Sequence, residues 1–164
     1  MIITLIGMMG VGKTTVGKAL SREINWYYYD IDKIISKRTG RCIPEIFSRG
    51  GNIVFRNWER KVISELYSKI SSGVVAAGGG AVLSPQNRKF FMNSGPVFYL
   101  AAEIEEIMAR IDVKNRPLLY QAENPESKII ELLSAREKLY NMGYKIDTTD
   151  LTIKETVNKI YNKI

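Results

Sequence analysis

The stretch "GMMGVGKTT", Gly7–Thr15, follows a short apolar run, "IITLI", and precedes a pattern typical of a helix. It matches G-x-x-x-x-G-K-[ST] in full, in the strand-then-helix context that this motif requires. Glycines let backbone N–H groups turn toward phosphate oxygens, and the start of the following helix adds free N–H groups and a positive dipole end. A chance glycine-rich turn is the competing interpretation, which the context disfavours. The stretch therefore predicts a loop that holds a nucleoside triphosphate.

Two side chains of this loop have expected roles of their own. The Lys13 ammonium adds a positive charge at the β- and γ-phosphates, and the Thr14 hydroxyl is a ligand that suits Mg²⁺. The residues of the loop that we expect to contact ATP are Gly10, Val11, Gly12, Lys13, Thr14 and Thr15.

Short apolar runs alternate with helical patterns along the chain. The runs predict buried strands at Ile2–Gly7, Trp26–Tyr29, Gly73–Ala77 and Pro96–Leu100, with a weaker one near "YKIDTTDLTI". Alternating strands and helices predict an α/β fold with a parallel sheet covered on both faces. Since no linker is visible, we expect residues 1–164 to form a single domain. The long irregular stretch Asp112–Pro125 is typical of a lid or binding loop.

Composition narrows the chemistry. The chain has 164 residues, a formal net charge of +7, no histidine and one cysteine, Cys42. Without histidine, the simplest proton acceptor near neutral pH is a carboxylate. A single cysteine favours the cytoplasm, and no apolar run approaches the ~20 residues of a membrane span, so we expect no membrane partner. The positive residues are spread along the chain without a block of like charge, and we expect no nucleic-acid partner.

Acidic residues follow the second predicted strand rather than the third. The run "GVVAA" ends in Gly78-Gly79-Gly80 with no acid, whereas Asp30 and Asp32 come directly after "WYYY". In an extended segment, residues two apart face the same side, so both carboxylates are expected in the crevice at the carboxyl ends of the strands. The alternative for Asp30 is that it only caps the next helix.

Three arginines are candidates for binding an anion. Arg56 and Glu59 lie side by side on a predicted helix, and the alternative is an ordinary surface ion pair. Arg116 lies inside the long loop, where an arginine can neutralise charge on a transferring phosphoryl group. From spacing alone, a solvated helix position is the favoured interpretation of Arg136.

Together these pieces resemble shikimate kinase. The matching stretches come in the order of that family: "GMMGVGKTT", "YYDID", "FRNWE", "AAGGG" and "RPLL", followed by R-x-x-x-Y from Arg136 to Tyr140. The likeness runs from Ile2 to about Tyr140, and the combination is far more specific than the loop alone. It implies a nucleoside monophosphate kinase type of fold, a three-layer P-loop domain with five parallel strands in order 2-3-1-4-5 and a lid over about residues 111–124.

The resemblance implies transfer of the γ-phosphoryl group of ATP to the 3-hydroxyl of shikimate, on the route to chorismate and aromatic amino acids. Its cofactor would be Mg²⁺, its partners ATP and shikimate, and we expect a monomer. Lys13, Asp32 and Arg116 would be the catalytic residues. Asp32 would orient or deprotonate the hydroxyl, and Arg116 would come in on the lid. Arg110 would lie near the adenine, and Asp30 would act on Mg²⁺ through water.

The substrate-binding residues that the resemblance implies are Asp32, Arg56, Glu59, Gly78, Gly79, Gly80 and Arg136. Arg56 and Arg136 would hold the carboxylate of shikimate, Glu59 would orient Arg56, and the glycines would let the backbone approach the substrate. This sequence departs from the common family pattern at Ile31, at Asn52 and in a lid one residue shorter. A related kinase of a small polyol acid such as gluconate, a non-catalytic ATP-binding module and a nucleic-acid kinase or binder stay open as alternatives.

Overall fold

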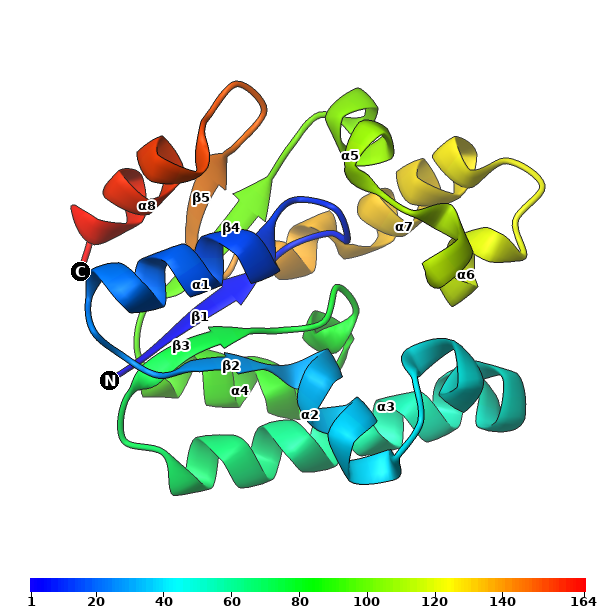
Figure 1. Ribbon diagram of the computed structural model, residues 1–164, viewed down its shortest axis with the longest axis horizontal. Coiled ribbons are helices and arrows are strands. Elements are labelled where there is room, and N and C mark those ends of the chain that lie inside the picture. Colours follow the sequence, from blue (N-terminus) through cyan, green and yellow to red (C-terminus); the bar gives the residue numbers. More distant parts are fainter.

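The computed structural model describes all 164 residues as a parallel sheet between layers of helices (Figure 1). The strands are β1 (Ile2–Ile6), β2 (Tyr28–Asp30), β3 (Gly73–Ala76), β4 (Val97–Ala101) and β5 (Tyr144–Asp147). They lie in the order β2-β3-β1-β4-β5, and every pairing is parallel. The predicted fold class and strand order are therefore confirmed.

The helices begin where the sequence supplies capping residues. The side chains of Ser84, Asn124 and Thr152 each accept a hydrogen bond from a backbone N–H of the turn that follows. The helices are α1 (Lys13–Glu23), α2 (Ile31–Thr39), α3 (Ile43–Lys69, kinked at Gly51), α4 (Pro85–Ser94), α5 (Ile104–Arg110), α6 (Pro117–Tyr120), α7 (Pro125–Tyr140) and α8 (Ile153–Tyr161), with 3-10 turns η1 (Ala81–Leu83) and η2 (Val113–Asn115). None of these helices has the length and apolar character needed to cross a membrane.

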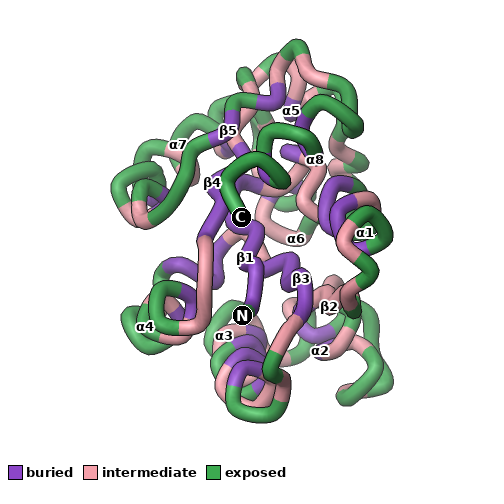
Figure 2. The backbone as a smooth tube through the Cα atoms, turned by 90° about the vertical axis from the view of Figure 1, so that its left-hand side faces the viewer, coloured by how far each residue is buried: buried purple, intermediate pink, exposed green.

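The core has two halves, one on each face of the sheet. In β1, Ile3 and Leu5 point to one face and pack in a cluster with residues of α1 and α8, whereas Ile2 and Ile6 belong to the cluster formed with α3 and α4. This alternation is the period of two expected of a strand covered on both sides. Figure 2 shows buried residues in β1 and its neighbours at the centre, with exposed residues on the outer helices.

Two predicted segments differ from those observed. The second strand ends at Asp30, not Tyr29, and α2 begins at once, because the Asp30 side chain accepts a hydrogen bond from the Lys33 backbone N–H and caps this helix. The predicted irregular stretch 112–125 contains η2 and α6, and Pro117 occupies the first turn of α6, where its missing N–H costs nothing.

Candidate active site

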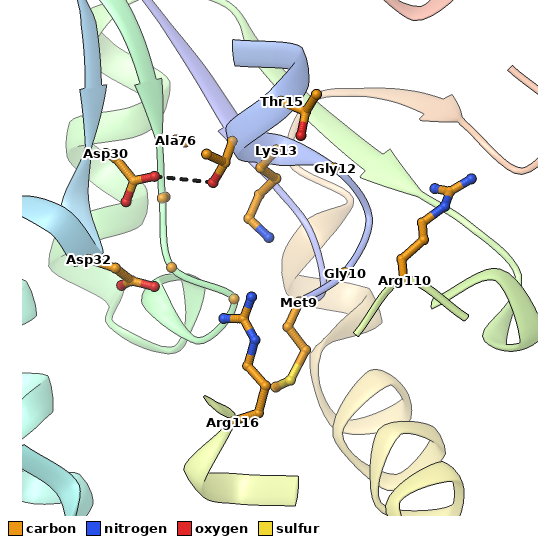
Figure 3. A pocket seen from close by; sticks show the side chains of 14 residues that line it. Met9, Gly10, Gly12, Lys13, Thr15, Asp30, Asp32, Ala76, Arg110 and Arg116 are labelled. Atoms are coloured by element: carbon orange, nitrogen blue, oxygen red, sulfur yellow. Dashed lines mark hydrogen bonds between the residues drawn. The ribbon is translucent and has the colours of Figure 1, made fainter. Parts of the chain in front are cut away.

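The carboxyl ends of β2 and β3 and the loop after β1 surround a polar cavity of about 320 Å³ (Figure 3). This is the position where open α/β sheets bind ligands. Lys13 and Arg116 point into the cavity from opposite sides, with Asp30 and Asp32 along a third. The fold thus brings together residues of the loop, the acidic pair and the long connection after α5.

The loop itself is shaped by its glycines. Gly10 and Gly12 have φ angles of 82° and 93°, a left-handed conformation that residues with a side chain adopt at a cost. The Lys13 ammonium donates hydrogen bonds to the carbonyl oxygens of Gly7 (2.8 Å) and Met8 (2.7 Å). Burial lowers the pKa of Lys13 to about 8, although the nearby carboxylate of Asp32 opposes this shift.

Asp30 is held from three sides. Its Oδ2 accepts hydrogen bonds from the hydroxyl of Thr14 (3.1 Å) and from the hydroxyl of Tyr28 (3.0 Å), and its Oδ1 accepts one from the Lys33 backbone N–H (3.2 Å). Asp30 is therefore a helix cap and a cavity residue at once. Burial and the neighbouring Asp30 charge raise the pKa of Tyr28 above its ordinary value, so its hydroxyl stays a donor at neutral pH.

Asp32 lines the same cavity as predicted, but it lies on a helix and not on an extended segment. The two acids do not share an extended segment, because Asp32 lies in the first turn of α2 while Asp30 ends β2. The turn still directs both carboxylates into the cavity. Asp32 Oδ1 is buried and has no hydrogen-bond partner. Burial, with the Asp30 charge adding to it, raises the pKa of the Asp32 carboxyl, against the attraction of Lys13.

A buried ion pair forms the wall next to Asp32. Arg56 Nη1 and Glu59 Oε2 are 2.7 Å apart on α3, and Glu59 is only 1% exposed. Burial raises the pKa of Glu59, and the Arg56 charge opposes this. The surface-pair interpretation is therefore wrong. A Cβ at Gly80 would lie 2.2 Å from Arg56 Nη2, so a side chain here would displace the guanidinium from its place beside Glu59.

The position of Arg136 also differs from the one that its spacing favoured. It is 4% exposed on α7 and lines a smaller cavity together with Arg56 and Arg116. The expected solvated position is therefore wrong, because the other face of α7 is the one that meets solvent. Arg136 forms no salt bridge, which leaves a buried positive charge. Such a charge is stabilised by an anionic ligand. This cavity and the larger one share Met9, Asp32, Gly78, Gly79 and Arg116.

Arg110 stands at the opposite end of the larger cavity. It pairs with Glu106 at 2.8 Å and also lines a third cavity, which lies between α1 and the segment from Thr148 to Thr156. Arg116, by contrast, is exposed and makes no salt bridge. Its guanidinium is therefore free to contact a ligand in the cavity of about 320 Å³ or in the smaller cavity beside Arg136, which together are the two inner cavities.

The comparisons with known proteins agree with this geometry. The family model described as shikimate kinase matches residues 9–164. The chain belongs to the shikimate kinase family. A shikimate kinase of Thermodesulfovibrio yellowstonii is 43% identical over 160 residues, which cover 96% of this chain and 91% of the relative. The chain is therefore a kinase, and the reaction it catalyses is the phosphorylation of shikimate in aromatic amino acid biosynthesis.

Solved structures show the same relationship. The shikimate kinase of Acinetobacter baumannii in complex with shikimate is 40% identical, with a TM-score of 0.93 over 99% of this chain and 91% of that one. A gluconokinase of Sinorhizobium meliloti has a TM-score of 0.57 at 15% identity, over 96% of this chain and 87% of that one. The second likeness extends to the fold alone, whereas the first is a likeness within the shikimate kinase family.

Sequence reasoning missed several residues of this site. The hydroxyl of Tyr28 at Asp30 was one, although its position two residues earlier on the same strand was a usable signal. The family motif that ends at Tyr140 gave this residue no role, whereas in the structure its hydroxyl donates to the Gly79 carbonyl, 61 positions away. The apolar side of the smaller cavity, which includes Ile43 and Phe47, also had no signal, because its helical segment was not predicted.

Proposed function

We propose that the two inner cavities bind the phosphates of ATP and the whole of shikimate side by side, and that the γ-phosphoryl group passes to the 3-hydroxyl between them. The observation that carries this proposal is that the cavities share Asp32 and Arg116. One cavity is surrounded by phosphate-binding groups, and the other by arginines that suit a carboxylate. The shared residues stand where the two substrates would meet.

ATP would bind at the loop after β1 and in the third cavity next to it. Backbone N–H groups of residues 10–15 and the Lys13 ammonium would hold the phosphates. Arg110 would lie beside the adenine in the third cavity, whose far wall includes Leu151 and Ile153. The Lys13 contacts with Gly7 and Met8 would be exchanged for phosphate oxygens, which are stronger acceptors because they are charged.

The residues present fit Mg²⁺. Mg²⁺ keeps several waters and uses phosphate oxygens of the nucleotide, so it needs few protein ligands. Thr14 would supply a hydroxyl oxygen, and Asp30 and the unpartnered Oδ1 of Asp32 would accept hydrogen bonds from metal-bound water. When bound, Mg²⁺ neutralises charge on the β- and γ-phosphate oxygens.

The shikimate half of the proposal uses α3, α7 and the glycine triplet. Arg56 and Arg136 would pair with the carboxylate, since a planar guanidinium matches a carboxylate in a two-point contact. Glu59 would keep Arg56 in place through the 2.7 Å ion pair. The backbone at Gly78, Gly79 and Gly80, bare of side chains, would approach the ring hydroxyls.

Asp32 would orient the 3-hydroxyl and accept its proton. The hydroxyl oxygen then forms a bond to the γ-phosphorus while the bond between this phosphorus and the bridging oxygen of ADP breaks. Lys13 and Arg116 would neutralise the charge on the transferring group, since a loose transition state requires mainly positioning and charge. Arg116, on the lid segment, would complete the site only when both substrates are bound.

The proposed unit of function is a single domain, residues 1–164, acting as a monomer in the cytoplasm. The only cysteine, Cys42, is free and exposed, which suits a reducing compartment.

The test is release of ADP, measured with shikimate, gluconate or an oligonucleotide as the acceptor. We expect turnover with shikimate only, and a product phosphorylated at the 3-position by ³¹P and ¹H NMR. Turnover with gluconate at a similar kcat/KM would contradict the assignment of the arginine cavity. ATP binding without transfer to any acceptor would contradict the proposed chemistry as a whole.

A further inference from the structure

Tyr28 contacts the acidic side of the site through its hydroxyl group. Tyr28 and Asp30 are two residues apart on β2 and therefore face the same side of the strand. The Tyr28 hydroxyl donates to Asp30 Oδ2 at 3.0 Å, and the Thr14 hydroxyl donates to the same oxygen at 3.1 Å. One carboxylate oxygen thus joins a residue of the loop to a residue of the strand.

The ring of Tyr28 is held by the core. It packs against α1 at Gly17, where an added Cβ would lie 2.6 Å from ring atom Cε2 and 3.2 Å from Leu5. Gly17 is buried and lies one helical turn after Thr14. Because Gly17 has no side chain, the ring of Tyr28 can lie against the backbone of α1, and its hydroxyl lies near the beginning of this helix. Packing therefore fixes the position of the ring.

Thr14 has no such support of its own. Its side chain is exposed, and its only hydrogen bond to the protein goes to Asp30. The Asp30 carboxylate is in turn fixed at Oδ2 by Tyr28 and at Oδ1 by the Lys33 backbone N–H. The packed ring of Tyr28 therefore helps to fix the Asp30 carboxylate, and this carboxylate in turn fixes the exposed hydroxyl of Thr14.

We propose that Tyr28 is a positioning residue, which fixes Asp30 and through it the Thr14 hydroxyl in the arrangement that receives the magnesium ion of the bound nucleotide; this rests on the magnesium roles proposed above for Thr14 and Asp30. Removal of the phenol oxygen leaves the ring packing intact. It also removes one of the contacts that fix the Asp30 carboxylate and leaves the cap to the Lys33 N–H in place, so more of the ordering has to be supplied when the ion binds.

The test compares Tyr28→Phe with Tyr29→Phe. Tyr29 is the neighbouring residue, packs against the core on the opposite face of the sheet, and its hydroxyl makes no hydrogen bond in the structure. Binding of ADP is measured by calorimetry, once with excess Mg²⁺ and once with EDTA, and the thermal midpoint of each variant is recorded. The wild-type ratio of the two affinities defines the contribution of the metal.

For Tyr28→Phe, we expect that ratio to fall about three- to tenfold, the range of one hydrogen bond. ADP affinity in EDTA, the KM for shikimate and the thermal midpoint should stay close to wild type. The Mg²⁺ concentration that gives half-maximal turnover should rise by a similar factor. Tyr29→Phe should leave the ratio unchanged. Equal ratios in Tyr28→Phe and wild type, or equal losses in the two variants, would overturn the positioning role.

Asp30→Asn separates this inference from the proposed function. If Asp30→Asn lowers the ratio and Tyr28→Phe does not, the magnesium role of Asp30 stands and the role of Tyr28 is refuted. If neither lowers it, both are refuted. In the double variant, we expect Tyr28→Phe to add little to the loss from Asp30→Asn, because the hydroxyl acts through that carboxylate. Full additivity would mean that Tyr28 acts elsewhere.

Discussion

The hydroxyl of Tyr140 donates a hydrogen bond to the carbonyl oxygen of Gly79 at 2.5 Å. Tyr140 ends α7 one turn after Arg136, and its ring stacks on Tyr99 of β4 with centroids 4.9 Å apart. The contact therefore joins the helix that supplies a buried arginine to the backbone of the glycine triplet. Both belong to the proposed shikimate site, so one hydroxyl ties together two of its walls.

Tyr140→Phe tests this connection. We expect the KM for shikimate to rise about three- to tenfold, because the hydrogen bond that fixes the triplet is lost, while the KM for ATP changes little. Tyr67→Phe is the matched control, since Tyr67 is buried in the same cluster and shares a hydrogen bond with Thr4 away from the cavities. Steady-state kinetics and thermal unfolding measure both effects. Equal KM changes in the two variants would show a general loss of stability instead.

The two acids of the cavity should differ when each is changed to asparagine. Asp32→Asn removes the proposed proton acceptor and should lower kcat by about 10²- to 10⁴-fold, with weaker shikimate binding and nearly unchanged ATP binding. The defect of Asp30→Asn should instead be partly relieved by raising the Mg²⁺ concentration. Separate titrations of shikimate and Mg²⁺ measure the difference. Rescue of Asp32→Asn but not Asp30→Asn by Mg²⁺ would exchange the two assignments.

Arg116→Ala should lower kcat far more than shikimate affinity. An arginine that acts on transition-state charge contributes about 10³ or more in rate, whereas Arg56 and Arg136 remain to bind the carboxylate. The matched control is Lys114→Ala, an exposed cation two residues earlier on the same segment. Single-turnover kinetics and calorimetry with shikimate give the two quantities. A wild-type rate in Arg116→Ala would leave this residue as no more than a surface charge of the lid.

The pH dependence of ATP use should report Lys13. Because burial lowers its pKa to about 8, the free protein loses this positive charge as the pH rises through that value. We therefore expect kcat/KM for ATP to fall above about pH 8, since this parameter follows ionisations of the free enzyme. Lys13→Arg stays charged over the whole range and should lack this decline, at a lower overall rate. The same decline in both proteins would assign it to another group.

Much of the fold was accessible from the sequence because its signals are local. The motif at Gly7–Thr15 requires a strand before it and a helix after it, and both are present as β1 and α1. Local residues also mark both ends of α4, because Ser84 caps its first turn and Gly95 follows its last residue. Strand order came from the resemblance to a known family, because periodicity shows that strands are buried but not which ones are neighbours.

Tertiary structure decided how the site is assembled. Sequence spacing favoured a solvated Arg136, whereas the resemblance to a known family implied a role at the substrate, and the structure shows the residue buried on α7 and lining a cavity. Asp30 turned out to cap α2 and to bind Thr14, so the two interpretations offered for it were not alternatives. The sequence by itself determined the nucleotide loop, the alternating elements and the acidic pair, because caps, turns and side-chain periods act over a few residues. The burial of Arg136 and the contact of Tyr140 with Gly79 depend on packing between distant segments, and such packing leaves no pattern within any one of them.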